Sequence, residues 1–115
     1  MTGAFPPREA DIQKQIIELL TSVGAYVLRT SQSRASRVTP GLPDLIALLP
    51  RRKGILLIEV KSAHGKQSDA QIICESRAQQ AGVPYVCGGL QEVRAALSSL
   101  GVLLPVDGRL GEPAG

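Results

Sequence analysis

Two carboxylates and one lysine, Asp44, Glu59 and Lys61, stand in the apolar middle of this 115-residue sequence. Residues 54–61 (GILLIEVK) are predicted to form a strand that is apolar on both faces, which is typical of a central strand covered by helices on each side. Because side chains alternate along a strand, Glu59 and Lys61 share one face and Val60 points to the other. Charged groups there are costly unless they bind a cation, a substrate or one another. The function is therefore expected at this face.

The numbering also predicts that the two acids face each other. Residues 44–49 and 55–61 are predicted strands, and residues 50–54 (PRRKG) form a hairpin with a basic tip between them. If the turn is centred on the Arg-Arg pair, Asp44 lies opposite Glu59 on one face of the sheet, with Cβ atoms about 4.5–5.5 Å apart. Two carboxylates so close repel each other, and a bridging divalent cation removes the conflict. Magnesium, which prefers oxygen ligands, fits such a pair.

A less specific interpretation of the same residues stays open. Glu59 and Lys61 could simply pair with each other, or Asp44 could cap the turn that precedes its strand. Neither alternative explains why the register brings Asp44 and Glu59 together.

Hydrophobic periodicity and turn residues predict the elements that hold these two strands. The order α-β-β-β-α-β-α indicates an α/β domain with a small mixed sheet flanked by helices. One domain over 8–101 is expected, with an N-terminal extension (1–7) and a C-terminal tail (102–115) that begins with a short strand at 102–104. The remaining predicted elements are a helix over 7–23, a strand over 25–29, a loop over 30–41, a helix over 68–82, a strand over 85–87 and a helix over 93–101.

Composition narrows the class of protein. With 43% hydrophobic and 20% charged residues the chain is globular, and its net charge of +3 is only weak support for a nucleic-acid partner. Two cysteines, Cys74 and Cys87, and a single histidine, His64, exclude a disulfide framework and a His/Cys metal cage. The sequence has no secretion signal and no apolar run that could span a membrane, so we expect a cytoplasmic protein that is not secreted.

The motif Pro43-Asp44, followed after one strand by Glu59-Val60-Lys61, is the PD-(D/E)xK pattern, and the chain resembles nucleases of that superfamily, which share a restriction-endonuclease-like fold. Flanking segments sharpen the resemblance to one branch, the virus-type replication-repair nuclease (VRR-NUC) domain. These segments are 8–13 (READIQ), 41–44 (GLPD) and 65–71 (GKQSDAQ). The resemblance runs from about Arg8 to Cys87 and implies a VRR-NUC-like nuclease domain over 8–101.

The resemblance implies a role for each residue of the pattern. Asp44, Glu59, the carbonyl of Val60 and Glu9 would hold Mg²⁺, for which Mn²⁺ would substitute. Lys61 would orient or deprotonate the attacking water, or stabilise the developing phosphate charge. Glu9 also has a simpler explanation, because an acid in the first turn of a helix interacts favourably with the helix dipole.

Two glutamines are further candidates. Gln13 is four residues from Glu9, on the same face of the predicted helix, and would lie near the metal. Gln71 would complete the site from the second helix, although its spacing from Ser68 also fits a capping box. The basic residues expected to bind DNA phosphates lie in three loops and at the end of the strand over 25–29: Arg29, Arg34, Arg37, Lys66, Arg51 and Arg52.

The sequence thus predicts a metal-dependent, structure-selective DNA endonuclease that acts on branched DNA such as Holliday junctions. A homodimer with two active sites would suit a two-fold symmetric junction, and neither a membrane nor a small-molecule cofactor is expected. Alternatives are a sequence-specific or non-specific duplex endonuclease, or a non-catalytic DNA-binding module on the same fold.

Overall fold

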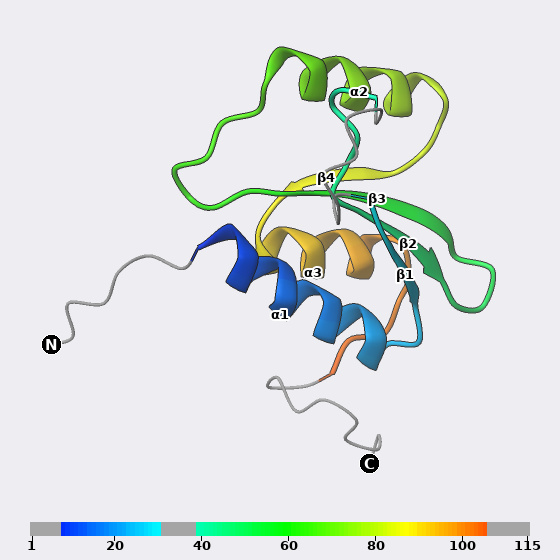
Figure 1. Ribbon diagram of the computed structural model, residues 1–115. Coiled ribbons are helices and arrows are strands. Elements are labelled where there is room, and N and C mark those ends of the chain that lie inside the picture. The colour runs from blue at the N-terminus through cyan, green and yellow to red at the C-terminus, as the bar shows by residue number, and fades with distance from the viewer. Residues whose placement is uncertain (1–7, 31–38, 106–115) are drawn as a thin grey trace, which may run out of the picture.

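The computed structural model, which describes residues 8–30 and 39–105, is a four-stranded sheet with helices on both faces (Figure 1). The predicted mixed α/β architecture and element order are confirmed. In chain order the elements are α1 (Glu9–Ser22), β1 (Tyr26–Arg29), β2 (Leu45–Leu49), β3 (Gly54–Val60), α2 (Asp69–Gln80), β4 (Tyr85–Gly88) and α3 (Leu90–Ser99). Pro7, the first residue of the predicted helix over 7–23, and most of the predicted loop over 30–41 lie outside the described residues.

The strands lie in the order β1-β2-β3-β4, antiparallel except for the parallel pair β3/β4. Ile46 pairs with Leu57 and Leu48 with Ile55, so the hairpin register predicted from the numbering is confirmed. Since α2 connects the two parallel strands, it crosses one face of the sheet, while α1 and α3 cover the other (Figure 1).

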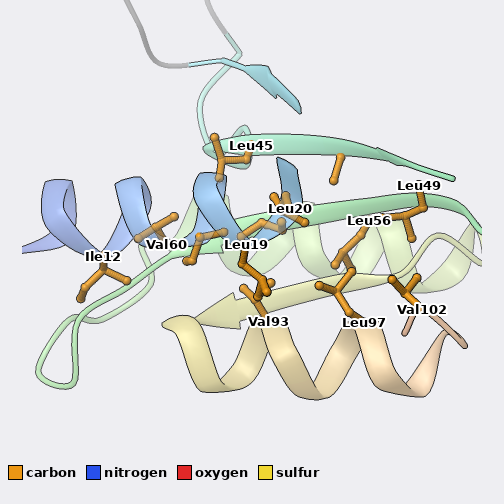
Figure 2. Close-up of a cluster of buried hydrophobic side chains, with 13 residues drawn as sticks. Ile12, Leu19, Leu20, Leu45, Leu49, Leu56, Val60, Val93, Leu97 and Val102 are labelled. Carbon is orange, nitrogen blue, oxygen red and sulfur yellow. The ribbon is translucent and has the colours of Figure 1, made fainter. Parts of the chain in front are cut away.

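The core lies between the sheet and the pair α1/α3 (Figure 2). Alternate residues of β2 and β3 point into it, and an amphipathic stripe on α1 meets them. The buried apolar residues of these elements are Ile12, Ile16, Leu19, Leu20, Leu45, Ala47, Leu49, Leu56, Ile58 and Val60. Because alternation sends Leu45 and Ile58 into the core, it sends their chain neighbours Asp44 and Glu59 to the face on which α2 lies.

The predicted strand at 102–104 is wrong. Val102 follows the left-handed Gly101 (φ +85°) and donates its backbone N–H to Leu97 O, which closes the end of α3. Val102 is buried in the core and Leu104 packs against it, so their apolar character reflects helix capping and core packing rather than a strand.

The second face of the sheet is only partly covered, contrary to the expectation of a strand buried on both sides. α2 lies over β4 and the carboxyl end of β3, where Ala78 is buried. On β1, on β2 and at the start of β3, Tyr26 is 66% exposed, and Leu48 and Ile55 also remain exposed. No helix in the described ranges is long and apolar enough to cross a membrane.

The tip of the β2/β3 hairpin holds two arginines in left-handed conformations. Lys53 N–H bonds to Pro50 O, and Arg51 and Arg52 between them have φ +56° and +62°. This is the turn that suits the twist of a hairpin, but it favours Asn-Gly over residues with long side chains. Replacing the pair by Asn-Gly (R51N/R52G) should raise the free energy of unfolding by about 1–2 kcal/mol, measured by urea denaturation.

A matched control for this prediction is R51Q/R52Q, which removes both charges and keeps both strained conformations. Its stability should equal that of the wild type. If both double variants are equally stabilised, relief of charge repulsion rather than backbone strain is the cause.

Candidate functional site

Asp44 immediately precedes β2, and the segment that carries it is fixed from two sides. The Thr30 N–H bonds to the Asp44 carbonyl at 3.0 Å, and the Thr30 hydroxyl donates to Pro43 O. On the other side Gly41 packs so tightly on α2 that a Cβ there would lie 2.4 Å from Ala70 O. Gly41 also has φ +85°, so only glycine fits this position without strain.

The Asp44 carboxylate is directed at the end of β3. Its Oδ2 accepts a hydrogen bond of 2.8 Å from the Val60 N–H. The pairing of β2 with β3 ends where Leu45 lies opposite Ile58, and its continuation by one residue sets Asp44 against Glu59. The two predicted acids therefore come together on one face of the sheet.

Glu59 is a carboxylate buried to 1% exposure, and each of its oxygens has a protein partner. Oε2 accepts a hydrogen bond from the Gln71 side-chain amide and lies 3.6 Å from Lys61 Nζ. Oε1 accepts one of 3.3 Å from the Tyr85 hydroxyl. Three elements thus surround one charge: the end of β3, α2 and β4.

Both carboxyl groups have raised pKa values. Burial raises the pKa of Asp44, against the Val60 hydrogen bond, and the negative charge of Glu9 raises it further. Burial also raises the pKa of Glu59, and the Asp44 charge adds to this, while Lys61 opposes it. The site therefore carries an excess of buried negative charge that a bound cation would relieve.

Glu9, at the start of α1, lies at the edge of this site. The side chains of Glu9 and Lys61 both approach Gly65, in the loop after β3. A Cβ added to Gly65 would lie 3.0 Å from Glu9 Oε2 and 3.1 Å from Lys61 Cδ. Gln13 does not share this position, because it lines a separate surface pocket with Lys14 and Arg29. The structure brings Glu9 towards Lys61 and leaves Gln13 elsewhere.

Gln71 has both of the roles that the sequence left open, that of a capping-box residue and that of a site residue. Its side-chain Oε1 accepts a hydrogen bond of 2.7 Å from the Ser68 backbone N–H. The Gln71 backbone N–H donates in return to Ser68 Oγ, which completes a capping box. Its side-chain amide nitrogen donates to Glu59 at the same time. The cap at the start of α2 therefore aims the amide at the buried carboxylate.

The basic residues predicted to bind DNA are dispersed around the molecule. Arg29 lies at the end of β1 beside α1, and Lys66 is exposed in the loop before α2. Arg51 and Arg52 lie in the turn beyond the far end of β2, a strand of five residues that is roughly 17 Å long, and Asp44 precedes its other end. The two remaining arginines, Arg34 and Arg37, fall outside the described residues. His64 is exposed in the loop after β3.

Two residues of the site were not identified from the sequence. Tyr85 was assigned only to a strand, and nothing local to it signals a contact with Glu59. Gly65 is part of the GKQSDAQ segment, where the absence of a side chain could have indicated a close approach.

The residues present fit a divalent cation, although they do not form a complete cage. Asp44 and Glu59 supply two carboxylates with excess negative charge, and magnesium commonly binds one or two carboxylates with water filling the remaining positions. In the described part of the chain, no three His, Cys, Asp or Glu side chains cluster closely enough to hold a metal by themselves. Further ligands would have to be backbone oxygen, water or substrate.

Comparisons with known proteins agree with this arrangement. The family described as the VRR-NUC domain matches residues 8–90. A solved structure titled "VRR_NUC domain" is similar to this chain with a TM-score of 0.65 and 27% sequence identity, over 78% of this chain and 94% of the other. The comparison with curated proteins gives no match.

Proposed function

The chain belongs to the VRR-NUC domain family, a family of nucleases, and from this premise we propose that it is a Mg²⁺-dependent endonuclease that cleaves branched DNA such as Holliday junctions. The observation that carries the proposal is the opposition of Asp44 and Glu59 beside Lys61 on one face of the sheet. DNA and a divalent metal are what a nuclease of this family implies. Branched DNA, magnesium as the metal, and a homodimer are the finer parts of the proposal.

Asp44 and Glu59 would hold the metal together with the Val60 carbonyl, and Glu9, at the edge of the site, would hold it through bound water. A bound divalent cation supplies positive charge that polarises the phosphodiester and activates water for attack. Asp44 is oriented for this by the Val60 N–H, and Glu59 by Gln71 and Tyr85. The residues thus hold two acceptors in place before the metal and the substrate arrive.

Lys61 would act on the water or on the phosphate. Its side chain is 16% exposed, and its ammonium lies 3.6 Å from Glu59 Oε2. Its backbone N–H bonds to Gly88 O at 3.0 Å, so the lysine is fixed to β4 where β3 ends. From there the ammonium can orient a water molecule or stabilise charge that develops on a phosphate oxygen.

Two features of the chain favour branched DNA over a specific duplex sequence. The three aromatic residues of the chain limit base stacking. The basic residues that the structure describes are spread over loops at both ends of the sheet, which suits contacts with phosphates rather than with bases. Such a substrate would place the protein in the cytoplasm, with the nucleoid or with phage DNA.

Cleavage assays on matched DNA substrates test this proposal. A mobile four-way junction, a flap and a linear duplex that share sequence should be incubated with protein and Mg²⁺ or Mn²⁺. We expect paired cuts in the junction at a rate at least about tenfold above that for the duplex, because two sites in a dimer match two equivalent strands. The mass of the protein in solution should correspond to a dimer.

Three outcomes count against parts of the proposal. Equal cleavage of junction and duplex would remove the structure selectivity. A preference for one sequence in linear DNA would favour a restriction-type enzyme. Binding without cleavage in either metal would favour a non-catalytic module. For each, an Asp44→Asn preparation purified in parallel controls for contaminating host nuclease.

A further inference from the structure

Tyr85 contacts the acidic site, although it belongs to none of the motifs of the sequence. It begins β4 and lies opposite Leu57 in the parallel pair β3/β4, so its side chain is on the same face of the sheet as Glu59. Its hydroxyl lies 3.3 Å from Glu59 Oε1. Because an ionised carboxylate can only accept, the tyrosine is the donor.

The two oxygens of Glu59 have different surroundings. Oε2 lies on the side of Lys61 and Gln71, two of the residues that line the site, whereas Oε1 bonds to Tyr85 from the neighbouring strand. The terminal torsion of a glutamate is soft, because a carboxylate rotates over a broad range about its last bond. A hydrogen bond to one oxygen therefore determines where the other oxygen points.

The surroundings of Tyr85 restrict its hydroxyl. The ring is half-buried beneath α2, which limits the positions that the hydroxyl can take.

We propose that Tyr85 is a positioning residue for Glu59: its hydroxyl holds Oε1 on the protein side and turns Oε2 towards Lys61, where the cation binds, and it thereby sets the affinity of the site for divalent metal. The inference rests on the proposed function for the identity of the ligand. Removing a hydrogen-bond partner of a metal ligand typically costs 10–100-fold in metal affinity.

Metal binding without DNA tests this role. Mn²⁺ binding should be measured by calorimetry on the wild type and on Tyr85→Phe, which keeps the ring and removes the hydroxyl. We expect about tenfold weaker Mn²⁺ binding, and junction cleavage that returns towards the wild-type rate as Mn²⁺ is raised. Tyr26→Phe is the matched control, since Tyr26 is 66% exposed on β1 and should leave Mn²⁺ affinity unchanged.

The outcomes separate this inference from the proposed function. Wild-type Mn²⁺ affinity in Tyr85→Phe would overturn the positioning role, and so would a loss of cleavage that added metal does not restore. Mn²⁺ binding by Glu59→Gln shows whether the wild type binds the ion through Glu59. If it does but the wild type cuts no DNA, the endonuclease proposal fails. The comparison of Tyr85→Phe with the wild type still tests the positioning role in that case. A wild type that binds no Mn²⁺ would overturn both.

Discussion

Asp44→Asn should abolish DNA cleavage, with a rate at least about a thousandfold below that of the wild type, while the protein remains folded. The amide has the shape of the carboxylate, and its oxygen can still accept the hydrogen bond that Val60 N–H donates to Asp44 at 2.8 Å. What the variant loses is the negative charge that would hold a divalent cation opposite Glu59. Single-turnover cleavage of a four-way junction with saturating Mg²⁺ measures the effect.

The thermal stability of Asp44→Asn should show that the variant is folded and that it lacks only the charge of the carboxylate. Folding raises the pKa of Asp44 and of Glu59, so the folded state binds protons more tightly than the unfolded state. Stability without metal should therefore rise as the pH falls from neutral through these raised values. At neutral pH without metal, the melting temperature of Asp44→Asn should be equal to or above that of the wild type. Any gap between the two melting temperatures should narrow in acid, where Asp44 of the wild type becomes protonated.

The control for Asp44→Asn is Asp11→Asn, the same change at an exposed acid on α1 that pairs with Arg8 at 3.6 Å. It should cleave as the wild type does. Mg²⁺ should raise the melting temperature of the wild type and of Asp11→Asn but not that of Asp44→Asn, because only proteins that bind the ion are stabilised by it. Equal cleavage by Asp44→Asn and the wild type would remove Asp44 from the mechanism.

Lys61→Met should lower the cleavage rate by about 100–1000-fold without weakening metal binding. Methionine keeps most of the apolar stem of the lysine, but it removes the ammonium that lies 3.6 Å from Glu59 Oε2. Because the site becomes more negative, Mn²⁺ should bind at least as tightly as in the wild type. Cleavage at saturating Mn²⁺ and calorimetry in the absence of DNA measure the two effects separately.

Lys14→Met, a change of the same kind at an exposed position of α1, is the control for Lys61→Met and should be neutral. Lys61→Met should lose cleavage and keep metal binding, whereas Asp44→Asn should lose both. A Lys61→Met protein that cleaves normally would exclude a chemical role for the lysine. One that no longer binds Mn²⁺ would indicate that the lysine organises the acidic pair instead.

The features that depend on local sequence were predictable. The opposition of Asp44 and Glu59 follows from the numbering once the turn between Arg51 and Arg52 is located, because an antiparallel hairpin has one register for a given turn. The capping box of Ser68 and Gln71 is equally local. Most of the candidate site could therefore be found without a structure.

Features that depend on distant packing were not predictable. The contact of Tyr85 with Glu59 exists because β4 pairs in parallel with β3 after the crossover through α2, and no local pattern specifies that register. Gln13 shares a helix face with Glu9, but it lies four residues, about 6 Å, further along α1 and lines a surface pocket with Arg29 instead. Val102 has the apolar pattern of a strand and is instead drawn into the core by the end of α3.

The claim on which all of this depends is that Asp44 and Glu59 together hold a divalent cation. Crystals grown or soaked with Mn²⁺ and measured for anomalous scattering locate such an ion directly. We predict an anomalous peak between the two carboxylates, about 2.0–2.2 Å from an oxygen of each, next to Lys61. A protein that cleaves DNA with Mn²⁺ and shows its only manganese peak away from Asp44 and Glu59 would contradict the account.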